Sequence, residues 1–160
     1  MKDIIFQPIG IVHSCYKETK GTPIQPASGM GAKGSIEIFA EYTEGLKDIE
    51  GFSHLILIYY FHRSEGFKLK VKPFLDENIH GVFSTRAPFR PNPIGLSVVK
   101  LVGRTNNILE IENLDILDGT PLLDIKPYVP EFDAAKTVRI GWITNSKHKI
   151  SHTVNDGRFE

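Results

Sequence analysis

The sequence predicts an all-β fold, a small β-barrel with long loops and little helix. Many short apolar or alternating segments of strand length follow one another along the chain. Turns rich in glycine, proline and asparagine separate them, and almost no segment has the 3.6-residue periodicity of a helix. This combination is typical of β-sandwiches and β-barrels. With 160 residues we expect one domain, with the barrel over residues 1–144 and a polar, loosely held C-terminal tail over 145–160.

The first part of the chain contains three predicted strands and one short helix. Residues 4–13 are apolar and β-branched, and predict a strand interrupted near Pro8. Residues 35–39 alternate between apolar and polar, which predicts a half-buried strand. A short helix is expected over 43–49. Residues 53–61 form a near-continuous apolar run, which predicts a fully buried strand.

Residues 67–74 alternate between lysine and apolar side chains. Lys68, Lys70 and Lys72 would lie on one face of a strand, with apolar residues on the other. The lysines suit RNA phosphates, but they are also typical of an edge strand that is protected from aggregation. Both interpretations stay open.

The remaining predicted strands belong to hairpins. Residues 96–102 and 108–111 flank a turn at 104–107, and short strands are expected at 81–84 and 139–144. Asp118 and Gly119 form a second turn signal, followed by a strand at 122–128 that Pro127 ends.

Residues 81–97 combine stiffness with chemistry. Pro88, Pro91 and Pro93 each fix φ and remove a backbone donor, so the segment is a rigid loop. It carries the guanidinium groups of Arg86 and Arg90, whose planar donors suit carboxylate and phosphate groups. It is either a preorganised clamp for an anion or a surface loop with solvated arginines.

The acidic residues near the end of the predicted barrel have two interpretations. Asp115, Asp118 and Asp124 lie close in sequence, as metal ligands often do, but Asp118 fits the turn with Gly119 better. In a strand, Asp124 and Lys126 share one face. They form either the polar floor of a site or a solvated ion pair.

Composition excludes several classes of protein. No apolar run approaches the roughly 20 residues that cross a bilayer, and no signal peptide is apparent, so we expect a cytoplasmic protein. Cys15 is the only cysteine and the histidines lack zinc-site spacing, so no metal is expected. Neither a dinucleotide-binding nor a P-loop motif is present. A net charge of zero argues against strong, non-specific polyanion binding.

Five segments resemble, in the same order, the motifs of a known family. They are residues 8–14, Phe52-Ser-His-Leu, Phe61-His62 at the end of the strand that follows, the proline-rich residues 83–97, and residues 118–128. On these residues the chain resembles the TsaA/TrmO family over most of 7–130, and Arg139-Ile-Gly-Trp resembles its short, single-domain members. The resemblance implies a β-barrel methyltransferase that uses S-adenosylmethionine and acts on N6 of threonylcarbamoyladenosine at position 37 of tRNA. It further implies a homodimer with the cofactor near the subunit interface.

The resemblance also implies which residues line the cofactor pocket. They are Pro26, Ala27 and Ser28 of the first long loop (residues 17–34), His62 and Arg63, Arg86, and the strand residues Leu122, Leu123, Asp124 and Ile125. Asp124 and His62 are the candidates for a catalytic base. Two alternatives stay open, a non-catalytic RNA- or nucleotide-binding barrel and a methyltransferase with a small-molecule acceptor.

Overall fold

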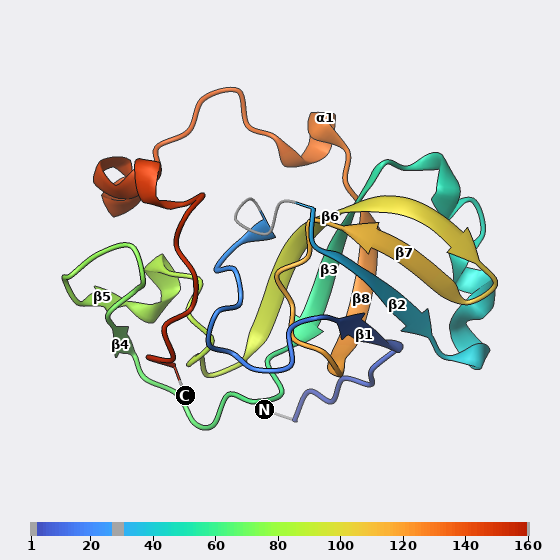
Figure 1. Ribbon diagram of the computed structural model, residues 1–160, viewed down its shortest axis with the longest axis horizontal. Coiled ribbons are helices and arrows are strands. Elements are labelled where there is room, and N and C mark those ends of the chain that lie inside the picture. The colour runs from blue at the N-terminus through green and yellow to red at the C-terminus, as the bar shows by residue number, and fades with distance from the viewer. Residues whose placement is uncertain (1–2, 27–30, 160) are drawn as a thin grey trace.

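A closed antiparallel barrel of six strands forms the centre of the molecule (Figure 1). The computed structural model describes residues 3–26 and 31–159. The strand order around the barrel is β1-β2-β7-β6-β3-β8. The strands are β1 (Gly10–Ser14), β2 (Lys33–Ile38), β3 (His54–Tyr60), β6 (Ile94–Thr105), β7 (Ile108–Glu112) and β8 (Thr120–Pro127). The predicted all-β class is therefore confirmed.

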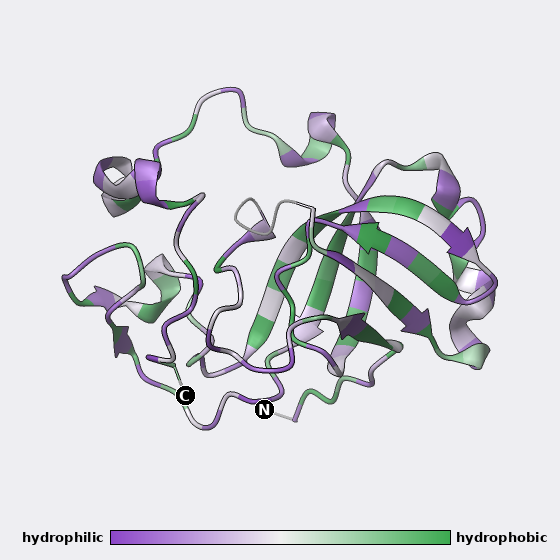
Figure 2. Ribbon diagram, viewed as in Figure 1, coloured by the Kyte–Doolittle hydropathy of each residue, from purple (hydrophilic) through white to green (hydrophobic). Residues whose placement is uncertain are grey.

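Alternation of side chains builds the barrel core. Figure 2 shows apolar and polar residues following one another along the strands. In β3, Leu55 and Leu57 are wholly buried, whereas Ile56 and Ile58 are only half-buried on the outer face. The prediction of a strand buried on both faces is therefore wrong. An antiparallel barrel fills its interior from one face of each strand and leaves the other outside.

The predicted turns are confirmed. Asn106 closes the β6–β7 hairpin with φ of 56°, a left-handed conformation that asparagine tolerates. Gly119 has φ of 73° before β8, and Asp118 Oδ1 accepts a hydrogen bond of 2.9 Å from the backbone N–H of Ser14.

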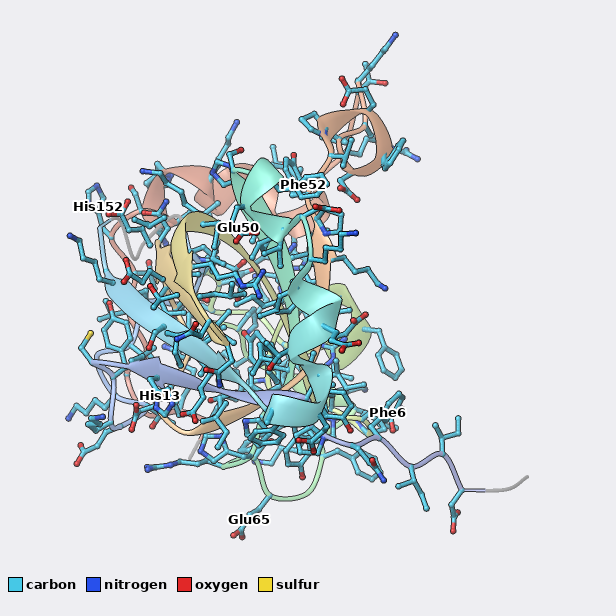
Figure 3. The ribbon with its side chains drawn as sticks, turned by 90° about the vertical axis from the view of Figure 1, so that its right-hand side faces the viewer. Phe6, His13, Glu50, Phe52, Glu65 and His152 are labelled. Atoms are coloured by element: carbon cyan, nitrogen blue, oxygen red, sulfur yellow. The ribbon has the colours of Figure 1, made fainter. Side chains whose placement is uncertain are left out.

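Short helices lie around the barrel. They are η2 (Ala40–Leu46), η3 (Ile49–Gly51) and α1 (Pro130–Asp133). The first two, seen with Glu50 and Phe52 in Figure 3, form a 3-10 segment close to the helix expected over 43–49. Arg104 Nη1 donates a hydrogen bond of 2.9 Å to the carbonyl of Leu46, which ties η2 to the barrel. None of the helices in the described ranges is long and apolar enough to cross a membrane.

A small lobe stands beside the barrel. It contains β4 (Lys70–Val71), β5 (His80–Gly81) and η4 (Val82–Ser84). The longer strands predicted over 67–74 and 81–84 are wrong. Phe67 and Leu69 are 58% and 60% exposed, because the lobe has no sheet face broad enough to cover them. Its core is the cluster of Val71, Val82, Ala87, Phe89 and Phe159.

Both ends of the chain differ from prediction. Residues 4–9 are not a strand: Ile4 and Ile5 are 77% and 84% exposed and pair with no strand of the described residues, and Figure 3 shows Phe6 on a segment that leaves the barrel. The strand expected over 139–144 is instead part of the 3-10 helix η5 (Gly141–Lys149). The C-terminal segment is not loosely held, because Phe159 is buried in the core of the lobe.

Candidate functional site

A cavity of about 350 Å³ opens where the barrel meets the lobe. This volume is in the range of small-molecule binding sites. Its walls come from the first long loop, the end of β3, the proline-rich loop, the start of β6, the turn before β8 and the C-terminal segment. The site is thus assembled from segments that are far apart in sequence.

The floor of the cavity is a buried chain of hydrogen bonds. The hydroxyl of Tyr59 lies 3.1 Å from Ser97 Oγ, which donates a hydrogen bond of 2.6 Å to Asp115 Oδ1. Tyr59 and Ser97 are buried, and both Tyr59 and Asp115 line or underlie the cavity. Burial raises the pKa of Asp115 to about 6 and also raises the pKa of Tyr59. The carboxyl of Asp115 therefore titrates close to neutrality.

Gly95 makes room for this floor. A Cβ atom at position 95 would lie 2.3 Å from Cε2 of the Tyr59 ring, far inside van der Waals contact. The ring can lie against β6 only because this residue has no side chain. The glycine therefore serves the packing of Tyr59.

The two arginines of the proline-rich loop have different roles. Arg90 Nη1 donates to three carbonyls, those of Val82, Thr85 and Ala87, at 2.8–3.3 Å, and so holds the loop in shape. Both arginines line the cavity, where Arg86 Nη1 donates a hydrogen bond of 2.6 Å to Gln25 Oε1. Arg86 fits the predicted anion clamp better, because its side chain is exposed whereas Arg90 is half-buried with Nη1 bonded to the loop backbone.

His62 faces the same cavity with a defined tautomer. Thr120 Oγ1 donates its single proton to the carbonyl of Leu117 at 2.7 Å. Its contact of 3.3 Å with His62 Nδ1 therefore requires that Nδ1 carries the proton. Burial, followed by the charge of Arg63, lowers the pKa of His62 and so favours the neutral ring. Nε2 then has a free lone pair.

The cavity brings together only part of the predicted site. His62, Arg63 and Arg86 line it, and Pro26 is half-buried next to the cavity residue Gln25. Ala27 and Ser28 lie outside the described residues. The four predicted strand residues lie on β8 and are not among the cavity walls. Leu122 is wholly inside the barrel core, Ile125 packs against that core, and Leu123 and Asp124 are half-buried.

Asp124 lies on the outer face of the barrel, not far from the cavity. Its Oδ2 is 2.8 Å from Lys126 Nζ, so of the two alternatives for this pair of residues the solvent-exposed ion pair is the one that forms. Ile58 is paired in register with Asp124 on one side and with Leu96 on the other, and Leu96 lines the cavity. Because neighbouring strands are about 4.8 Å apart, Asp124 is roughly 10 Å from that rim.

Sequence reasoning missed several residues of the cavity. Tyr59 and Ser97 sit in apolar strands where no polar motif marks them, and Asp115 was considered only as a possible metal ligand. Asn155 and Phe159 also line the cavity, although composition predicts a loose tail there. Trp142 stacks on His80 in the lobe, with the two ring centroids 4.6 Å apart. The one available signal for Asp115 was an acidic residue enclosed between Leu114 and Ile116.

The side chains of the cavity suit an organic ligand with an aromatic part and charged ends. The rings of Tyr59, Phe61 and Phe74 offer apolar walls, and Arg86 and Asp115 supply opposite charges. Within the described residues, no group of three or more His, Cys, Asp and Glu side chains is arranged to hold a metal ion.

Comparison with known proteins gives a consistent picture. Residues 11–134 match the family model of the tRNA-methyltransferase O N-terminal domain. The chain is 59% identical over 156 residues to a probable S-adenosyl-L-methionine-binding protein of Pyrococcus abyssi, covering 98% of this chain and 85% of that protein. It is 40% identical over 140 residues to the tRNA (adenine(37)-N6)-methyltransferase of Escherichia coli, covering 81% of this chain and 60% of that enzyme.

A solved structure agrees with the fold. The crystal structure of TrmO from Pseudomonas aeruginosa matches with a TM-score of 0.74 and 38% identity, over 88% of this chain and 63% of that one. The chain therefore spans less than two thirds of these two bacterial relatives, but most of the archaeal one.

Proposed function

The chain belongs to the family defined by the N-terminal domain of tRNA-methyltransferase O, and from this premise we propose that it is a tRNA methyltransferase. The proposed reaction moves a methyl group from S-adenosylmethionine to N6 of threonylcarbamoyladenosine at position 37 of tRNA. The observation that carries the proposal is the match over residues 11–134, which includes the barrel and most walls of the cavity. We further propose a cytoplasmic location, where tRNA is modified.

The residues of the cavity fit the proposed cofactor chemically. Arg86 offers a planar guanidinium for the carboxylate of its methionine part, and the aromatic walls suit the adenine. Asp115 offers a carboxylate to its ammonium group or to the ribose hydroxyls. When bound, S-adenosylmethionine supplies a methyl group on a sulfonium, which leaves as a neutral thioether.

His62 is the base that the geometry favours. The carbamoyl group withdraws the N6 lone pair of the acceptor, so this nitrogen needs its proton removed before it forms the new N–C bond. Nε2 of a neutral His62 has the lone pair for that proton, and Thr120 holds the opposite nitrogen. Asp124 is the second candidate, but Lys126 holds its carboxylate as an ion pair on the outer face of β8. Alignment of the two reactants supplies much of the remaining rate.

We propose that the active form is a homodimer. Leu96, Ile58 and Asp124 form a row across the outer face of β6, β3 and β8, and Tyr60 and Leu96 are 40% and 48% exposed there. A partner subunit on this apolar face would bury it. The partner would also bring its own Asp124 and the neighbouring β8 residues towards the cavity rim. The cofactor residues expected in the cavity and those expected on β8, which lie apart in one subunit, would then meet across the interface.

Mass spectrometry of tRNA nucleosides tests the reaction. The protein is incubated with S-adenosylmethionine and tRNA that carries threonylcarbamoyladenosine, and this nucleoside should gain the mass of one CH2. The same tRNA with unmodified adenosine 37 is the control. Methylation of the control tRNA as well would contradict the substrate assignment, and methylation of neither would favour a small-molecule acceptor.

A thermal shift separates enzyme from binding module. A ligand that binds only the folded state must raise the melting temperature. No shift at saturating S-adenosylmethionine, together with tRNA binding, would favour the non-catalytic alternative.

Mixed dimers test the shared site. Arg86→Ala and Asp124→Ala subunits are each expected to be inactive. If the two residues act across the interface, random pairing in a symmetric dimer restores one intact site in each mixed dimer, or roughly a quarter of wild-type activity. If both residues act within one subunit, the mixture stays inactive.

A further inference from the structure

Charge is distributed unevenly along the chain. Residues 1–133 contain 14 Lys and Arg against 17 Asp and Glu, whereas residues 134–160 contain five against two. The zero net charge of the whole chain therefore conceals a basic C-terminal segment on an acidic barrel and lobe. A basic stretch of this kind is the electrostatic signature of a phosphate-binding surface.

Four of the five basic side chains of this segment are exposed and unneutralised, and the fifth, Arg158, pairs with Asp156. Lys136, Arg139, Lys147 and Lys149 are exposed, and none of them forms an ion pair with any described residue. Lys149 helps to lower the pKa of Glu77 through its charge, but it does so less than Lys72 and Arg158. The lysines of the barrel strands, by contrast, lie in ion pairs: Lys33 and Lys100 with Glu112, and Lys126 with Asp124.

The segment is fixed to the lobe at its start. Trp142 Nε1 donates a hydrogen bond of 2.9 Å to the carbonyl of Ser84. The Trp142 ring stacks on the His80 ring, with a distance of 4.6 Å between the ring centroids. Trp142 and Ser146 thus turn inward, while Lys147, His148 and Lys149 face solvent. The position of the helix is therefore set by the same lobe that carries the proline-rich loop.

The segment is also fixed to the cavity at its end. The backbone of Asn155 exchanges hydrogen bonds of 2.8 Å with Gly21 and Thr22 of the first long loop. The Phe159 ring contacts Phe74 and Phe89 edge to face, at 5.0 and 5.5 Å. Figure 1 shows this part of the chain running between the lobe and the first loop. The C-terminal segment is therefore one wall of the cavity.

These two anchors limit the distance between the basic side chains and the site. Lys149 precedes the cavity residue Asn155 by six positions, so their Cα atoms are at most about 20 Å apart. His152, labelled at the surface in Figure 3, lies between them. A phosphate bound here would be held within a few nucleotides of a base in the cavity.

We propose that residues 136–152 form a phosphate-binding surface that positions the RNA substrate next to the cavity. This inference rests on the proposed function and names the part of the chain that contacts the nucleic acid. The lysine stripe at 68–72 fits this role less well, because Lys72 pairs with Glu77 and Lys68 lies over the Phe89 ring. The C-terminal segment combines free charge with a fixed position.

The test compares two double variants, each of which replaces two lysines by uncharged glutamine. K147Q/K149Q removes two cations from the segment, and K33Q/K47Q removes two exposed cations outside it, at the start of β2 and directly after η2. The dissociation constant for tRNA is measured by filter binding at several salt concentrations. Each lost phosphate contact should reduce the steepness of the plot of log K against log salt concentration by about 1. The slope for K147Q/K149Q should therefore be shallower by about 1 to 2, and this variant should bind tRNA about tenfold more weakly than the wild type.

The readouts distinguish failure of this inference from failure of the proposed function. K147Q/K149Q should keep wild-type affinity for S-adenosylmethionine and the wild-type melting temperature, and K33Q/K47Q should keep the wild-type salt slope. An unchanged slope in K147Q/K149Q, or an equal loss in both variants, would overturn the inference. If wild-type protein binds tRNA but never methylates it, the proposed function fails while the binding surface is still measured.

Discussion

The barrel and the lobe beside it are stabilised by different means. The barrel has six strands joined by continuous backbone hydrogen bonds, around a core of 14 buried hydrophobic residues. The lobe has two strands of two residues each and a core of five. In the lobe, hydrogen bonds from side chains to backbone carbonyls take the place of a long strand-to-strand ladder. The main ones are donated by Arg90 to the proline-rich loop and by Arg158 to Pro73.

This difference explains where the cavity lies. The barrel supplies a rigid edge, formed by the end of β3 and the start of β6, and the lobe supplies Arg86 on a loop that a few contacts hold. Regions with few buried apolar contacts open more easily than a core. We therefore expect changes in the lobe to alter ligand binding before they alter global folding.

The largest effect on stability is expected for Leu57→Ala. Leu57 is wholly buried in the barrel, so the lost contacts and the cavity left behind should lower the free energy of unfolding by about 2–5 kcal/mol. Val82→Ala in the lobe is the matched variant, because Val82 is 1% exposed. Hydrogen exchange should speed up throughout the chain in Leu57→Ala but only within the lobe in Val82→Ala. Uniform acceleration in both would mean that barrel and lobe unfold as one unit.

Arg90→Ala and Arg86→Ala should separate structure from binding. Loss of three charge-assisted hydrogen bonds in Arg90→Ala should weaken the lobe by about 2–3 kcal/mol. Arg86→Ala should change stability by less than about 0.5 kcal/mol, since its side chain is exposed at the cavity, yet it should abolish the thermal shift by S-adenosylmethionine. Melting curves with and without cofactor measure both, and a normal shift in Arg86→Ala would remove this residue from the site.

Gly95→Ala addresses the contact between β6 and the cavity floor. The new methyl group would overlap the Tyr59 ring, and overpacking of this kind costs about 1–3 kcal/mol. Tyr59→Leu should relieve the overlap, so the double variant should be more stable than the sum of the two single effects predicts. Denaturant unfolding of all four proteins measures this coupling, and strictly additive effects would show that the clash is absorbed elsewhere.

The barrel was more predictable from sequence than the site because it depends on local patterns. Alternation at 35–39, the apolar run at 53–61 and the turns at Asn106 and Gly119 each encode an element within a few residues. In the lobe, the same local patterns did not predict the structure. Lys68 to Phe74 alternates as well as any strand, but a strand longer than two residues needs a partner of equal length, and β5 offers two residues.

The site was predictable only where a motif marked it. The proline-rich segment pointed to Arg86, although periodicity and spacing did not distinguish it from Arg90, whose three carbonyl partners exist only in the folded loop. Asp115 and Tyr59 meet through Ser97, across 38 residues of sequence between the tyrosine and the serine. Contacts between residues so far apart in sequence form only when the barrel closes, so no motif in the sequence marks them.

A modest gain of stability at neutral pH is expected for Asp115→Asn. The pKa of Asp115 is raised from 3.8 to about 6, so the stability linked to this group is present below pH 4 and is lost as the pH rises through 6. An amide cannot ionise, so at pH 7 the variant should be about 1 kcal/mol more stable than the wild type. This gain is less than the full linkage because the amide weakens the Ser97 hydrogen bond. Urea unfolding at pH 4 and pH 7 measures the difference. A gain of stability that comes with weaker cofactor binding would mean that the barrel keeps a destabilising charge at this edge because the cavity uses it; equal pH dependence of the two proteins would mean that the carboxylate is as well solvated as any on the surface.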